Sequence, residues 1–308
     1  MLLPRLVVTA VAGWLPMAGQ AAEPVHPVKP LLWKVEGQGM EKPSYLFGTM
    51  HLGDKAVVTL HPAAEKAFGE ATMVHTEVAL DMASQMESLQ GMMRDDGKTL
   101  DAAIGAELAE RLDEELKLVN PAFNAAPFQV LRTWVIAYML PYLEEQMAGI
   151  KPLDLVLWER AVNEGKKTAG MQESKDQLVG FNELSDEEQT LFLTTVLDYM
   201  QRNREEGTDP IKEAIAIYLS GDADKVSALA TDYLAELTGG KEAPLMEKLL
   251  KRILNDRDVI MADYIDATLK KNPEDVHFFA AGAGHYATKG GVPDKLVEKG
   301  YTVTRVEE

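Results

Sequence analysis

Two histidines follow a glycine at the same short spacing near opposite ends of the chain. In SYLFGTMHLG, a β-like apolar run stops at a glycine and His51 comes three residues later; in HFFAAGAGHY, the same spacing delivers His285. A glycine lets the backbone turn sharply and lets a ligand approach closely, and a loop just beyond a strand is a usual position for catalytic side chains. Either these are unrelated histidines after ordinary strand-ending glycines, or they belong to one site.

A carboxylate lies in a third apolar run, MVHTEVAL. Side chains two residues apart in a strand share a face, so His75 and Glu77 are predicted to point the same way. Glu77 could join His51 and His285 as a metal ligand, or act as a general base on a water. Two neutral imidazoles and a carboxylate suit Zn²⁺, Mn²⁺ or Co²⁺ and leave positions open for water and a substrate carbonyl. The alternative is a solvated glutamate on an edge strand.

These residues can meet only if one sheet takes strands from both ends of the chain. From about 80 to 272 the apolar spacing is helical, and no low-complexity linker divides the chain. We therefore predict one α+β domain over 22–308, with a mixed sheet built from both ends and the helical middle packed on it. The predicted strands cover 31–37, 44–51, 72–78, 276–282 and 301–307.

Several helix boundaries inside the helical middle can be predicted. Ser185 and Glu188 form a capping-box pattern ahead of an apolar run. A helix is expected to open at Asp209–Pro210 and to close at Gly221, and a long one is expected from about Pro244 to the Lys-Lys-Asn-Pro sequence that ends at residue 273.

Charge and the N-terminus limit the function classes. A net charge of −18 offers no basic stripe for nucleic acid and disfavours docking on anionic lipid. Residues 1–21 combine Arg5, a short apolar run and small residues, which predicts a signal peptide and a periplasmic or secreted protein. No later segment has the length of a membrane span, so stable membrane insertion is not expected after cleavage. The chain contains no cysteine.

The motifs together resemble a known family. FGTMHLG, TEVAL and the terminal FFAAGAGH…GGVPDKLVEKGYTV closely resemble the TraB/PrgY/GumN family, which includes the Tiki metalloproteases. The likeness runs over nearly the whole mature length. GMQESKDQL, with Glu173 and Gln177, is similar to the family's middle signature, and Arg257 in LNDRDVIM is similar to its late arginine. After GAGH, however, this chain lacks the family's usual Leu-x-Gly.

The resemblance implies a fold related to erythromycin-esterase-like and ChaN-like proteins and a divalent-metal peptidase centre responsive to manganese or cobalt. His51, His285 and Glu77 would be the metal residues. Arg257 would stabilise an oxyanion, with a surface arginine paired to a neighbouring aspartate as the alternative. Glu173 would orient a ligand from outside the first coordination sphere, with an exposed charge as the alternative.

Three functions remain open on the sequence. The first is a metal-dependent hydrolase, peptidase-like, that acts on a peptide or small-molecule amide or ester. The second is a binding protein that sequesters a peptide or signal without turnover. The third is a metal-independent hydrolase in which His51 acts as base and Glu77 orients it. The dinucleotide pattern in GAGHYA is weak, because Gly290 and Gly291 interrupt the helix that should follow it.

Overall fold

The computed structural model describes residues 26–241 and 243–307. Its centre is a six-stranded sheet in the order β4-β3-β5-β2-β1-β6. The strands β2, β5, β3 and β4 run parallel, whereas β1 pairs antiparallel with β2 and with β6. The strand bounds are β1 Leu32–Glu36, β2 Ser44–Thr49, β3 Met73–Val78, β4 Lys167–Gln172, β5 His277–Gly282 and β6 Thr302–Arg305. The predicted α+β class and the mixed sheet from both chain ends are confirmed.

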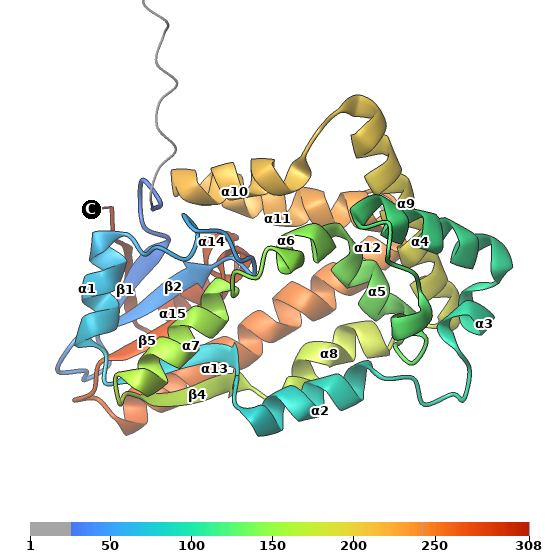
Figure 1. Cartoon of the computed structure of the whole chain (residues 1–308). Coiled ribbons are helices and arrows are strands. Elements are labelled where there is room, and N and C mark those ends of the chain that lie inside the picture. The colour runs from blue at the N-terminus through green and yellow to red at the C-terminus, as the bar shows by residue number, and fades with distance from the viewer. Residues whose placement is uncertain (1–25, 242, 308) are drawn as a thin grey trace, which may run out of the picture.

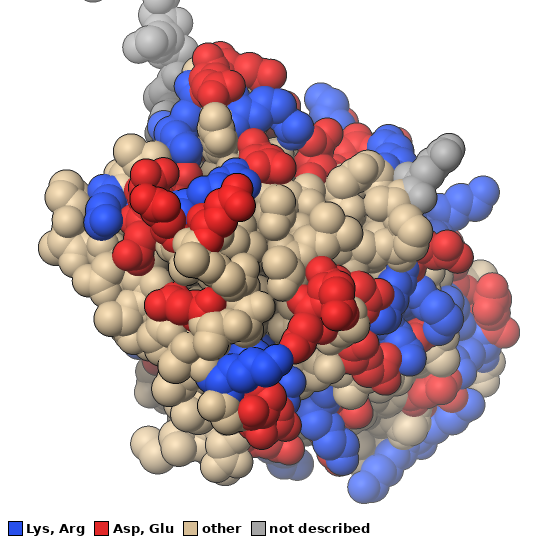
Figure 2. Space-filling model, turned by 90° about the vertical axis from the view of Figure 1, so that its right-hand side faces the viewer, with Lys and Arg blue, Asp and Glu red and all other residues tan. Residues whose placement is uncertain are grey.

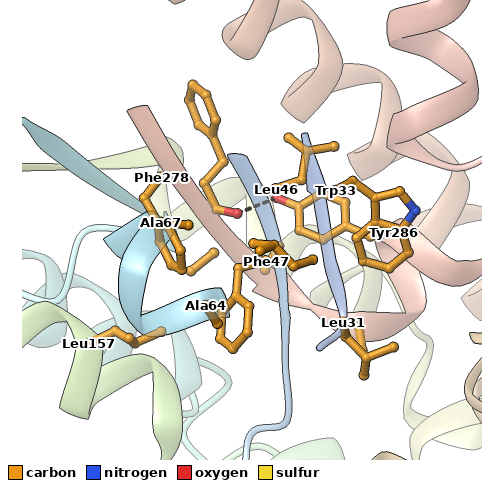
Figure 3. Close-up of a cluster of buried hydrophobic side chains, with 14 of the residues drawn as sticks. Leu31, Trp33, Leu46, Phe47, Ala64, Ala67, Leu157, Phe278 and Tyr286 are labelled. Atoms are coloured by element: carbon orange, nitrogen blue, oxygen red, sulfur yellow. Dashed lines mark hydrogen bonds between the residues drawn. The ribbon is translucent and has the colours of Figure 1, made fainter. Parts of the chain in front are cut away.

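The central strand is apolar for a physical reason. Strand β5 lies between β3 and β2, and all of its residues except the terminal Gly282 are buried. A parallel strand that is covered on both faces usually has a continuous apolar sequence, and Phe278–Ala281 is such a sequence. In Figure 3, Phe278 lies with Phe47 and Leu46 of β2 in one cluster of buried side chains.

Helices occupy most of the chain between β3 and β5, and Figure 1 shows the sheet at one end of the molecule and α3, α4, α5 and α9 at the other. The α-helices are α1 Pro62–Glu70, α2 Met82–Met92, α3 Leu100–Ile104, α4 Ala106–Val119, α5 Thr133–Met139, α6 Leu143–Met147, α7 Leu153–Asn163, α8 Ser174–Asn182, α9 Asp186–Glu206, α10 Pro210–Ser220, α11 Ala223–Thr238, α12 Pro244–Leu250, α13 Asp256–Lys271, α14 Ala283–Ala287 and α15 Val292–Glu298. Short 3-10 turns are η1 Ala126–Phe128 and η2 Leu140–Tyr142, and η3 Lys251–Asn255 is a π-helical segment.

The predicted helix boundaries hold. The Ser185–Glu188 capping box is present at the start of α9. Asp209 caps α10, which ends at Gly221 in the left-handed conformation. The predicted long helix is α12 continued through η3 into α13. No helix in the described part of the chain is long and apolar enough to cross a membrane, and the predicted signal peptide lies outside the described residues.

Strand β4 corrects the prediction that 80–272 is helical throughout. Its sequence, KTAGMQ, has little β propensity of its own, and it forms because β3 offers a free edge for parallel pairing. Gly170 is required there, since a Cβ at this position would come within 2.4 Å of the Ala79 nitrogen. The strand therefore depends on tertiary pairing that local periodicity does not reveal.

The buried apolar side chains of the described residues form two hydrophobic cores. One surrounds the sheet and includes Phe68 and Phe279. The other lies among the helices and includes Ile136, Phe192 and Leu249. The π-helical segment η3 connects α12, which packs in the second core, with α13, which packs in the first. A π-helical turn changes the direction of the side chains that follow it, and such turns occur frequently at functional sites.

A fully buried pair of histidines, His75 and His277, lies in the sheet in its neutral form. His75 Nδ1 lies 3.0 Å from the Tyr264 hydroxyl, and His75 Nε2 lies 3.0 Å from His277 Nδ1. Burial, and then the neighbouring His277, lower the pKa of His75 to about 3. Unfolding exposes this imidazole. Below its ordinary pKa of about 6.5, the unfolded state therefore binds a proton that the folded state does not bind.

We expect the free energy of unfolding to fall by about 1.4 kcal/mol per pH unit between roughly pH 6 and pH 4 through His75 alone. His75→Phe keeps an aromatic ring against Phe279 and should remove this contribution to the slope, which corresponds to about one proton bound on unfolding. Urea unfolding at several pH values measures it, with His26→Ala as the control. An unchanged slope in His75→Phe would show that this pair does not set the acid sensitivity.

Candidate metal and hydrolytic site

Three neighbouring parallel strands bring the predicted residues together. Strand β5 pairs with β2, with Thr49 opposite Gly282, and on its other side it pairs with β3. His51 follows β2, Glu77 is near the end of β3, and His285 lies on α14 directly after β5. Ligands in sheets of this kind bind beyond the carboxyl ends of the strands. The predicted common face of His75 and Glu77 is also observed, because both contact α13.

The two histidines converge on one carboxylate oxygen. Glu77 Oε1 lies 3.4 Å from His51 Nε2 and 3.9 Å from His285 Nε2. Glu77 and His285 are buried, whereas 48% of the His51 side chain is exposed. The site is therefore reached from solvent on the His51 side.

Each imidazole is anchored by its own carboxylate. His51 Nδ1 lies 2.8 Å from Asp154 at the start of α7, and Thr49 donates a 2.7 Å hydrogen bond to the same aspartate. His285 Nδ1 lies 2.6 Å from Asp258 in the first turn of α13. A carboxylate at Nδ1 holds the proton there and leaves the Nε2 lone pair for a metal or a proton. Both Nε2 atoms face the site.

Electrostatics keep Glu77 ionised and favour positive charge around it. Arg257 pairs with Glu77 Oε2, and the Gly282 N–H donates to Oε1 at 2.7 Å. Although burial opposes ionisation, Arg257 and His51 hold the pKa of Glu77 well below its usual range. The Asp154 carboxylate, against the effect of burial, raises the pKa of His51 well above its usual value. The site therefore favours the protonated His51 imidazolium, and a metal would have to displace its Nε2 proton.

The two motif glycines permit close approach and do not make a left-handed turn, since neither has a positive φ. A Cβ on Gly48 would lie 3.0 Å from the Ala283 Cβ. A Cβ on Gly282 would lie 3.0 Å from His51 Nε2 and 3.2 Å from Glu77 Oε1. Gly282 thus keeps open the space that the histidine and the glutamate face. The chain passes directly from β5 into α14 at Gly282, without a left-handed residue.

The remaining predicted residues lie in different positions. Arg257 is buried and also donates to Gln172 at 3.3 Å, so it is neither a surface arginine nor paired with a neighbouring aspartate. Its guanidinium is occupied by Glu77. Glu173 is exposed, pairs with Lys175, and is not brought to the cluster. Gln177 of the same segment does reach it, with its amide 3.5 Å from Glu77 Oε2.

Sequence reasoning missed Asp154 and Asp258. Asp258 follows Arg257 directly and could have been noticed as the third polar residue at the start of the same helix. Asp154 lies 103 residues after His51, and no spacing links the two. Their roles depend on how α7 and α13 pack beside the strand ends.

The donor types fit a divalent metal, although no complete metal cluster is in place. Two imidazole nitrogens with carboxylate partners and one glutamate oxygen are the ligands that Zn²⁺, Mn²⁺ or Co²⁺ accept. Both Glu77 oxygens, however, already have protein partners. Within residues 26–241 and 243–307, no group of three or more metal-binding side chains is arranged around one point. A metal would therefore require small side-chain movements at Glu77 and the two histidines.

Comparisons with known proteins agree with the motifs. A model of the TraB/PrgY/gumN family matches residues 31–305. Two curated relatives from Danio rerio, named Metalloprotease TIKI2 and Metalloprotease TIKI1, are 26% and 24% identical over 88% and 91% of this chain. Metalloprotease TIKI1 from Homo sapiens is 25% identical over 88% of the chain. The chain spans 60% to 64% of the length of these relatives. No solved structure matches significantly.

Proposed function

The chain belongs to the TraB/PrgY/gumN family, and from that premise we propose that it is a metal-dependent, peptidase-like hydrolase. The observation that carries the proposal is the convergence of His51 Nε2 and His285 Nε2 on Glu77 Oε1 beyond three neighbouring strands. The three relatives described above are named metalloproteases, which supports the same reaction class. With the predicted leader over 1–21, the proposal places the protein in the periplasm or outside the cell.

Each side chain has a distinct task in this proposal. His51 and His285 hold the ion, Asp154 and Asp258 fix the orientation of the two rings, and Glu77 remains ionised beside them. A divalent ion bound there would supply Lewis-acid polarisation of the scissile carbonyl and a more acidic water.

Two further contacts shape how Glu77 acts. Arg257 and the Gly282 N–H hold the Glu77 carboxylate in place and make it a weak base. It would therefore accept a proton only from a water that a bound ion has made more acidic, and would pass that proton to the leaving amine. The half-exposed His51 marks the side from which the substrate enters.

Chelation separates this proposal from its two alternatives. The purified protein is incubated with a mixed peptide library before and after chelator treatment, and again after addition of Mn²⁺, Co²⁺ or Zn²⁺. We expect many cleavages per chain, loss of cleavage on chelation and recovery with at least one metal. Capture that saturates at one peptide per chain would favour the sequestering function. Cleavage that survives exhaustive chelation would favour the metal-independent His51–Glu77 hydrolase.

Gly282→Ala is expected to block the site while leaving the fold intact. At φ −47° and ψ 132° the backbone accepts alanine, but the new methyl would meet His51 Nε2 and Glu77 Oε1. We expect kcat/KM to fall at least about tenfold, the effect of about 1.4 kcal/mol in transition-state stabilisation. Gly69→Ala, which adds a methyl in open space, is the control. Equal activity in the two variants would show that the space at Gly282 is not used.

A further inference from the structure

An aromatic and acidic cluster lies among the helices beside the site. Tyr138 of α5, Tyr142 of η2 and Tyr233 of α11 follow one another with ring centroids 6.2 Å and 6.1 Å apart. Their planes are inclined by 54° and 56°, so the rings do not cover each other's faces. Glu145 of α6 comes three residues after Tyr142, and its charge acts on the Tyr233 hydroxyl, whose pKa is raised by burial and, in part, by this charge. Tyr138 is exposed, and the other three members are partly buried.

One polar atom of this cluster is buried without a partner. Glu145 Oε2 has no hydrogen-bond partner among the described residues, whereas the Tyr233 hydroxyl lies beside the Tyr142 hydroxyl. Glu145 also forms no ion pair within the described part of the chain, and the Lys212 amine, which attracts it weakly, is 84% exposed and pairs with Asp209. Burial raises the pKa of the Glu145 carboxyl, so its charged form lacks the compensation that a bound cation would give.

The cluster is adjacent to the proposed catalytic residues. A Cβ on Gly284, next to His285, would lie 3.3 Å from the Ala230 Cβ of α11, and Tyr233 is on the next turn of that helix. On the other side, α6 with Glu145 leads through the loop at Ile150 into α7, which carries Asp154. That loop lies against the His51 segment, because a Cβ on Gly53 would overlap the Ile150 carbonyl.

We infer that Tyr138, Tyr142, Tyr233 and Glu145 bind the cationic side chain, lysine or arginine, of a peptide substrate. That the bound peptide is a substrate rests on the proposed peptidase function. That it binds at this place rests on the cluster alone. Tyrosine faces attract an ammonium or guanidinium within about 6 Å of the ring centroid, and the attraction strengthens when the cation is desolvated. Glu145 supplies the counter-charge, and the net charge of −18 draws cationic peptides towards the protein.

The test compares two tripeptide amides, acetyl-Ala-Lys-Ala and acetyl-Ala-norleucine-Ala, which differ in one ammonium group. Binding to the full chain is followed by NMR titration, so that no turnover is needed. We expect the lysine peptide to bind at least about tenfold more tightly, a difference of about 1.4 kcal/mol. Glu145→Gln should erase the preference. Glu144→Gln, the same charge change at the exposed neighbouring position, should keep it.

Each outcome decides one of the two proposals. Equal binding of both peptides, or the same preference in Glu145→Gln and Glu144→Gln, would overturn the inference whether or not the library is cleaved. A preference for lysine without cleavage of the library would support the site and reject the hydrolase. Should Glu145→Gln fold poorly, Tyr233→Phe keeps the ring and removes only the hydroxyl beside Tyr142, and it should weaken lysine binding relative to wild type.

Discussion

Arg257→Met is expected to destabilise the protein by about 3–5 kcal/mol, the usual result of removing one partner from a buried ion pair. Glu77 is 4% exposed, and Arg257 is the guanidinium that compensates its Oε2. Methionine keeps much of the side-chain volume but leaves that oxygen facing only the Gln177 amide at 3.5 Å. The variant should also lose activity, because the carboxylate is no longer fixed beneath the histidines.

Urea unfolding at neutral pH measures this loss, and the chain offers a matched control. Arg252 is one and a half turns earlier in the same continuous helix, is 38% exposed, and pairs with Glu183 and Asp256 at the surface. Arg252→Met should cost no more than about 1 kcal/mol. Adding Glu77→Gln to Arg257→Met should recover stability without recovering activity. A loss in Arg257→Met no greater than that in Arg252→Met would contradict the buried-pair interpretation.

A graded loss of activity is expected along the contacts that lead to the proposed metal ligands, His51 and His285. Removing an outer carboxylate partner of a ligating histidine costs about 10–100-fold in metal affinity or activity, which is the loss expected for Asp154→Asn and for Asp258→Asn. His51→Ala and His285→Ala remove the nitrogen itself and should exceed the upper end of that range. Activity and Co²⁺ affinity, measured on the same preparations, should fall together.

The two aspartates provide an internal check. Asp154 is held by Thr49 and anchors an exposed ring, whereas Asp258 anchors a buried one. His285→Ala leaves Asp258 unpartnered and should reduce stability by about 1–3 kcal/mol, so folding is measured alongside activity. If Asp154→Asn and Asp258→Asn both match wild type in Co²⁺ affinity, the aspartates do not position the histidines for a metal.

The features that could be predicted from the sequence are those set by residues close together in the chain. The repeated Gly-x-x-His spacing, with apolar runs before each glycine, indicated two strands of one sheet, and the alternation in β3 placed His75 and Glu77 on one face. The capping box at Ser185 and the stop at Gly221 were readable because a helix terminus is satisfied by residues close to it in sequence.

What the sequence did not reveal depends on packing between distant segments. The edge strand β4 forms only against β3, and its own residues do not favour a strand. Asp154 reaches His51 from the start of α7, and Asp258 reaches His285 from the first turn of α13. Arg257 was identified by resemblance, but its engagement with Glu77 needed the buried geometry.

The central claim is that His51 and His285 together hold one divalent ion. Elemental analysis of the purified protein, loaded with Co²⁺, Mn²⁺ or Zn²⁺ and then desalted, tests it most directly. We predict about one ion per chain for wild type and for the His26→Ala control, and none for the His51→Ala, His285→Ala double variant. Wild-type protein without bound metal under all three conditions, or a folded double variant with the same metal content as wild type, would contradict the account.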